Sequence, residues 1–148
     1  MLRNIGGYLG AVATAYVLAS IASTQSVLAN LTEMGVTINL KTRFEAIGHD
    51  LLGLTSIYLP IIALAFIIAW PATGLIVKLL PRARTIGYVL AGFTAIIAAH
   101  LILKQLVEIT GIAAARTTFG LIVQGLAGAA GGLMFVRLVP VSRRKPVD

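Results

Sequence analysis

Four long apolar stretches constrain this chain more than any other feature of its sequence. They cover about residues 5–28, 51–72, 86–109 and 117–139. An α-helix needs about 20 mostly apolar residues to cross the hydrocarbon core of a bilayer. Backbone groups in lipid must be hydrogen-bonded within their own segment, so stretches of this length predict spanning helices. We therefore expect an all-α integral membrane protein in which a bundle of four transmembrane helices forms a single domain over residues 1–148.

The composition agrees with a membrane protein. Of the 148 residues, 58% are hydrophobic and only 11% are charged, and the mean hydropathy is +0.95, whereas soluble domains have roughly 25% charged residues. The absence of cysteine excludes disulfides, thiolate metal sites and cysteine nucleophiles. A cleaved signal peptide is a rival interpretation of residues 5–28, with Ala29 at its cleavage site. This run is, however, longer than the roughly 7–15 apolar residues of a signal peptide.

The connection between the first two stretches contains a candidate surface helix. Asn39 is a suitable N-cap, and residues 40–48 place Leu40, Phe44 and Ile47 on one predicted helical face. Such a segment predicts a short interfacial helix on the extracytoplasmic membrane surface.

The second stretch is followed by further apolar residues as far as Leu80, and Pro60 and Pro71 fall inside this long run. Because tryptophan favours the membrane interface and proline disrupts a helix, we expect Trp70 and Pro71 to mark the inner boundary of this span.

The charge distribution predicts the topology. Four spans put both termini on one side of the membrane. That side has eight basic residues, namely Arg3, Lys78, Arg82, Arg84, Arg137, Arg143, Arg144 and Lys145. The other side has four basic residues and every acidic residue except Asp148. The positive-inside rule then places both termini, including the tail at residues 140–148, in the cytoplasm. The net charge of +7 is explained by topology and lipid contact, without nucleic acid.

Polar side chains inside the predicted spans are the candidates for a site. The third stretch has His100, Lys104 and Glu108 at helical spacing, on one stripe. Counting helical rise from the outer end of each helix puts four residues at a similar depth, roughly 10–13 Å below the outer edge, one from each helix. These are Ser20, Tyr58, His100 and Gln124. The favoured interpretation is a structural hydrogen-bonded layer. The alternative is the floor of an outward-facing cavity that binds a lipid or another small hydrophobic ligand.

Charged residues near the outer edge form a predicted rim above this layer. The favoured interpretation is a set of mutually neutralising charges. One alternative is recognition of an anionic group by Arg43, Lys104 and Arg116. The other is a metal or haem site, which we disfavour because no metal-binding motif is present and His100 lies roughly 13 Å deeper than Asp50. Its candidate ligands are His49, Asp50, His100 and Glu108.

Small residues predict close helix packing. Gly6 and Gly10 have the GxxxG spacing, as do Gly128 and Gly132. Such pairs allow two helix backbones to approach each other in lipid. Packing within one bundle and packing between subunits of a homo-oligomer remain equal alternatives.

No catalytic motif is present, and we expect no cofactor. In general layout the chain is similar to the small four-helix inner-membrane proteins of bacteria. Its polar residues do not match small multidrug carriers, fluoride channels or membrane glutathione transferases. We expect a non-enzymatic protein that forms a homo-oligomer or acts as an accessory subunit of a larger membrane complex. The alternative is a small transporter or lipid-binding protein with a cavity around His100, and a membrane-embedded enzyme ranks third.

Overall fold

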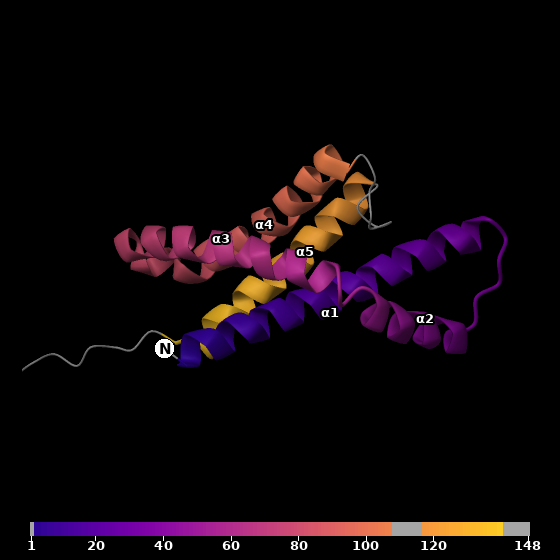
Figure 1. The fold of residues 1–148 in the computed structure, drawn as a ribbon, viewed down its shortest axis with the longest axis horizontal. Coiled ribbons are helices and arrows are strands. Elements are labelled where there is room, and N and C mark those ends of the chain that lie inside the picture. The colour runs from indigo at the N-terminus through magenta and orange to yellow at the C-terminus, as the bar shows by residue number, and fades with distance from the viewer. Residues whose placement is uncertain (1, 108–116, 141–148) are drawn as a thin grey trace, which may run out of the picture.

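The computed structural model describes residues 2–107 and 117–140, which form helices and no strand (Figure 1). In chain order the helices are α1 (Leu2–Glu33), α2 (Leu40–Gly53), α3 (Tyr58–Leu79), the 3-10 turn η1 (Pro81–Ala83), α4 (Arg84–Val107) and α5 (Thr118–Leu138). Within this part of the chain, four helical segments are long and apolar enough to cross a membrane: α1, α3, η1 with α4, and α5. The predicted all-helical class with four candidate spans is confirmed.

The second apolar stretch is divided between two helices. Leu51 and Leu52, which we placed in the second span, lie in α2, and α3 begins only at Tyr58. Pro60 accounts for the break because it has no N–H to donate to the carbonyl of Ser56, and its ring would clash with that carbonyl in a continuous helix. Pro60 instead lies in the first turn of α3, where the backbone N–H groups have no partner within the helix.

The N-cap at Asn39 is confirmed, since its side chain accepts a hydrogen bond from the Thr42 N–H at 2.8 Å. The three residues predicted to share one face of α2 differ in exposure. Ile47 is half-buried, whereas Leu40 and Phe44 are 74% and 73% exposed. The helix turns back along the end of α1 (Figure 1). We call residues 24–53 the α1–α2 hairpin.

Helix α5 is the centre of the bundle, with α4 on one side and α1 on the other (Figure 1). The sequence permits this because α5 is rich in glycine. A Cβ added to Gly128 would overlap the backbone of Gly92 on α4, and one added to Gly92 would overlap Gly128. A Cβ on Gly132 would likewise overlap the Tyr88 carbonyl. The GxxxG pair of α5 therefore packs inside the chain, against α4.

The GxxxG pair of α1 behaves differently. A Cβ on Gly10 would lie 2.5 Å from Leu138 Cδ1, so this glycine also faces α5. A Cβ on Gly6 would meet no atom within 4 Å. The neighbouring Gly7 faces Val139, the residue directly after α5, so Gly7, and not Gly6, is the glycine that packs at this end of α1.

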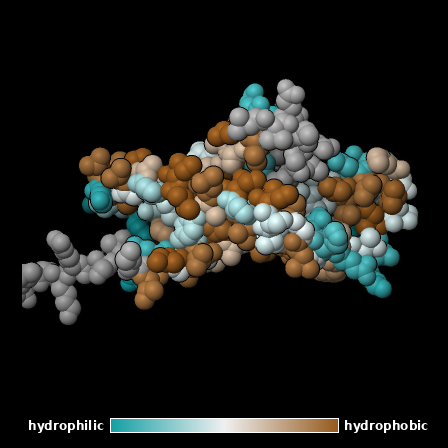
Figure 2. Space-filling model, viewed as in Figure 1, coloured by the Kyte–Doolittle hydropathy of each residue, from teal (hydrophilic) through white to brown (hydrophobic). Residues whose placement is uncertain are grey.

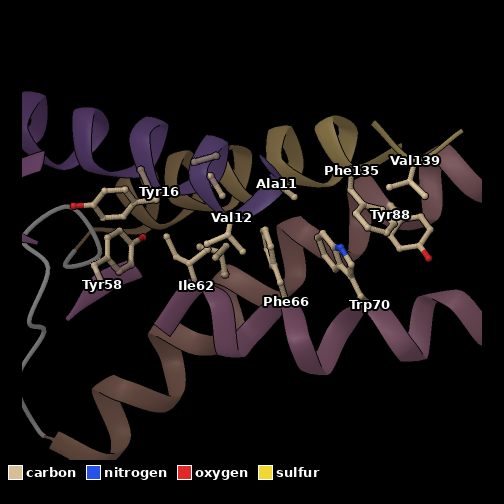
Figure 3. Close-up of a cluster of buried hydrophobic side chains, with 14 residues drawn as sticks. Ala11, Val12, Tyr16, Tyr58, Ile62, Phe66, Trp70, Tyr88, Phe135 and Val139 are labelled. Atoms are coloured by element: carbon tan, nitrogen blue, oxygen red, sulfur yellow. The ribbon is translucent and has the colours of Figure 1, made fainter. Parts of the chain in front are cut away.

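An aromatic cluster fills the core between α3, α4 and α5 (Figure 3). Phe66 stacks on Trp70 with ring centroids 4.1 Å apart. Trp70 in turn lies 5.6 Å from Tyr88 and 5.5 Å from Phe135, again between ring centroids. We expected Trp70 and Pro71 to mark the end of the span. Instead Trp70 is buried, and α3 continues through Pro71 to Leu79.

The start of α1 and the end of α5 lie together at one end of the bundle. Arg3 donates from Nη2 to the Pro140 carbonyl at 3.0 Å. Arg84 donates to the carbonyls of Val136 and Val139. The last carbonyls of a helix have no partner within it, so these guanidinium groups satisfy and stabilise the C-terminus of α5. We call this the basic end of the bundle.

Candidate functional site

Of the four polar residues that we predicted at one depth, three contact each other through their side chains. Tyr58 is the first residue of α3, His100 lies on α4 and Gln124 on α5. The Tyr58 hydroxyl donates to Gln124 Oε1 at 2.7 Å, and its oxygen lies 3.4 Å from His100 Nε2. Gln124 Nε2 donates to the carbonyl of Ala19 on α1 at 3.1 Å. Side chains from three helices and a carbonyl from α1 thus form one layer.

The direction of each hydrogen bond in this layer follows from the acceptors. The carbonyl of Ala19 can only accept, so the amide of Gln124 must point its oxygen toward Tyr58. His100 Nδ1 lies 2.8 Å from the Ile96 carbonyl, so Nδ1 carries a proton. The single Tyr58 proton is committed to Gln124 at the shorter distance. His100 Nε2 therefore has only a long contact with the Tyr58 oxygen.

Ser20, the fourth predicted member, is fully buried on α1 beside Ala19. Its hydroxyl has no hydrogen-bond partner among the described residues, and it forms no bond to the other three. All four side chains are at most 6% exposed, so the layer excludes solvent.

Further hydrogen bonds join α1 to α2 beyond this layer, and we did not predict their donors, Tyr16 and Thr24. Tyr16 donates from its hydroxyl to the Leu51 carbonyl at 2.5 Å. Thr24 donates to Asp50 Oδ2 at 2.8 Å. The signal was available in the sequence, because Tyr16, Ser20 and Thr24 follow one another at four-residue spacing and so share one stripe of α1.

Two described residues of the predicted rim, Arg43 and Lys104, lie on different helices. Arg43 donates to Gln25 Oε1 at 2.7 Å and so binds α2 to α1. Lys104 is exposed on α4. Glu108 and Arg116 lie outside the described residues, and the anion-binding set stays a prediction.

The candidate metal ligands are also separated. His49 Nδ1 lies 3.9 Å from Asp50 Oδ1 in the hairpin, and the His49 side chain is 89% exposed. His100 is buried in the layer described above. Among the residues that the structure describes, no group of three or more His, Cys, Asp or Glu side chains is placed to hold a metal ion.

A cavity of about 380 Å³ lies between α3 and α4. Its lining is made of alanine, isoleucine and leucine side chains, and His100, Tyr58 and Gln124 are not among them. The polar atoms of the layer therefore face each other across the bundle, and the side chains that line this cavity are all apolar. The predicted outward-facing cavity with His100 at its floor is therefore a different feature from this cavity, and it stays a prediction.

Comparison of the chain with protein-family models, with curated proteins and with solved structures finds no match. The function must therefore be argued from the geometry. The polar layer can stabilise the bundle, and the apolar surfaces can bind lipid or protein.

Proposed function

We propose that this protein is a non-enzymatic integral membrane protein that self-associates through α2. The observation that supports this is the exposure of Leu40 and Phe44 on α2, at 74% and 73%. Met34, in the turn that leads into α2, is 71% exposed. We call these three residues the hairpin patch.

The length of α1 supports a position of this patch outside the hydrocarbon. Its 32 residues correspond to about 48 Å at 1.5 Å per residue, against a hydrocarbon core of about 30 Å. The hairpin also holds exposed charged groups, including Lys41 and Glu45, which favour water. On the face shown in Figure 2, hydrophobic residues cover much of the surface, and the most hydrophilic residues lie toward the ends of the helices. If the hairpin extends into water in this way, its exposed apolar side chains are typical of a surface that binds a partner.

The charges beside the patch favour a second copy of this chain as the partner. Lys41 and Glu45 lie one turn apart on α2, with side chains 84% and 65% exposed, and their Nζ and Oε1 atoms are 3.8 Å apart. If two α2 helices pack antiparallel about a two-fold axis, Lys41 of each copy faces Glu45 of the other, while Leu40 and Phe44 meet in the centre. A two-fold interface requires this kind of self-complementarity.

We also propose an orientation. The basic end of the bundle has five basic residues, and the hairpin has only two, Lys41 and Arg43. The five are Arg3, Lys78, Arg82, Arg84 and Arg137. The positive-inside rule then places the basic end in the cytoplasm and the hairpin on the far side of a bacterial inner membrane. A reporter fused after Asp148 tests this: activity confined to the cytoplasm supports the orientation, and activity confined to the outside contradicts it.

The mass of the gently extracted protein tests the self-association. We expect native mass spectrometry in mild detergent to show an oligomer of the wild-type chain and mainly monomer for the double variant Leu40→Ser, Phe44→Ser. The matched control is Lys41→Ser, Glu45→Ser, which alters the same turns of α2 but keeps the apolar pair, and we expect it to remain an oligomer with weaker association. A wild-type chain that is monomeric at all concentrations contradicts the proposal.

A further inference from the structure

The cavity between α3 and α4 has a floor of small side chains. Its volume is about 380 Å³, and five of its lining residues are alanines, namely Ala65, Ala69, Ala95, Ala98 and Ala99. Large apolar side chains form its rim. Leu64, Ile68 and Ile102 are 60%, 68% and 56% exposed. The cavity is therefore open along its side, toward the bilayer.

The alanines are spaced as in a helix-packing motif, but α3 and α4 do not close on them. Ala65 and Ala69 on α3 are four residues apart, as are Ala95 and Ala99 on α4, and both pairs line the same cavity. Small residues at this spacing normally let two helices approach each other closely. Close approach occurs instead between Gly92 and Gly128, where α4 meets α5.

The turn at η1 explains why the cavity remains open. Near the turn the two helices touch, since a Cβ on Gly87 would lie 3.4 Å from Val77 Cγ2. From there α3 runs toward the α1–α2 hairpin, while α4 diverges from it along α5 (Figure 1). The cavity lies in the wide half of this V, where no side chain of the described residues fills it.

We propose that this cavity binds one acyl chain of a membrane lipid. The cavity spans nine residues of each helix, from Ile61 to Ala69 and from Ala95 to Leu103, and the eight steps between the first and the last give about 12 Å of helical rise. Its volume of about 380 Å³ therefore corresponds to a cross-section of roughly 30 Å². A helix of 10–12 Å diameter needs on the order of 80 Å² or more. The cavity is too narrow to hold a whole partner helix and suits an unbranched chain.

The volume also sets the length of chain that fits. A methylene group takes up about as much room as a water molecule in the liquid, ~30 Å³, so the cavity holds about a dozen chain carbons. Purely apolar cavities do not retain water, and the only other apolar molecules at this depth are lipids and protein helices. This site is independent of the hairpin patch, so either proposal can fail without the other.

Native mass spectrometry of the protein extracted from vesicles of palmitoyl-oleoyl phosphatidylglycerol and phosphatidylethanolamine tests the site. Under collisional activation that removes loosely bound lipids, we expect each wild-type chain to keep one lipid. Ala99→Phe fills the cavity with a ring, so we expect that lipid to be lost. Ala13→Phe adds the same ring to an exposed position of α1, and we expect it to keep the lipid.

The folding of each variant is checked by its thermal unfolding, and Ala99→Leu provides a smaller change that we expect to reduce lipid retention without unfolding. Equal lipid retention by wild-type, Ala99→Phe and Ala99→Leu proteins would overturn the proposal. So would a change in oligomer mass on Ala99→Phe with the retained lipid unaffected, because that result would identify a protein helix as the occupant.

Discussion

The hydrogen bond between Tyr58 and Gln124 gives the most informative prediction about the bundle. Tyr58→Phe keeps the ring and removes only the hydroxyl that donates to Gln124 Oε1 at 2.7 Å. Both side chains are at most 1% exposed, so no water replaces the lost donor. Gln124→Leu removes the acceptor, and also the bond from Nε2 to Ala19. The carbonyl of Ala19 remains bonded within α1, so this second loss is small.

The magnitude follows from what each variant leaves unpaired. A buried polar group that loses its partner costs about 1–3 kcal/mol, while measured hydrogen bonds between membrane helices average about 0.6 and reach about 1.7 kcal/mol. We therefore expect each single variant to lower the free energy of unfolding by about 1–2 kcal/mol. The double variant leaves neither group unpaired, so we expect a coupling of about 1 kcal/mol.

Reversible unfolding in mixed micelles with increasing denaturing detergent measures all four proteins of this cycle. The control pair is Tyr8→Phe with Gln124→Leu. Tyr8 donates to the Ala63 carbonyl at 2.6 Å and shares no bond with Gln124, so these two changes should be additive. If Tyr58→Phe and Gln124→Leu are additive to within about 0.3 kcal/mol, the hydrogen-bonded layer does not stabilise the bundle as we argue.

Two other predictions concern the contacts between helices. Gly128→Ala places a methyl group into the backbone of Gly92, and we expect thermal unfolding to show that the free energy of unfolding falls by about 1–3 kcal/mol. The control is Gly6→Ala, whose methyl group meets no atom within 4 Å and which should be neutral or stabilise the protein by up to about 1 kcal/mol. Equal losses of stability in the two variants would contradict the packing of Gly128 against Gly92. Thr24→Val removes the hydroxyl that donates to Asp50. We expect faster hydrogen exchange in α2 and a fall of about 0.5–1.5 kcal/mol in the free energy of unfolding. Unchanged exchange in α2 would show that this hydrogen bond does not hold α2 against α1.

The sequence predicts those parts of the fold that depend on length and rise. Four apolar segments predict four candidate spans. Counting 1.5 Å of rise per residue was enough to predict that Tyr58, His100 and Gln124 lie at one depth. The N-cap at Asn39 was predictable because capping depends on a few neighbouring residues. Each of these inferences uses only local geometry.

Other features depend on how the helices rotate and tilt against one another. Apolarity alone did not show that α3 begins at Tyr58, because Leu51 and Leu52 are as hydrophobic as the span that follows. The burial of Trp70 depends on Tyr88 and Phe135 from two other helices. The cavity arises from the divergence of α3 and α4, since the alanine spacing by itself predicts closure.

The central claim, that α2 joins two copies of the chain, is tested most directly by cysteine cross-linking, because the natural chain has no cysteine. We predict that Phe44→Cys in native membranes forms a disulfide-linked dimer under mild oxidation. Leu52→Cys, which is 82% exposed in the same helix but about 12 Å further along it, should form no disulfide-linked dimer. A dimer from both variants to the same extent, or from neither, would contradict an interface centred on Leu40 and Phe44.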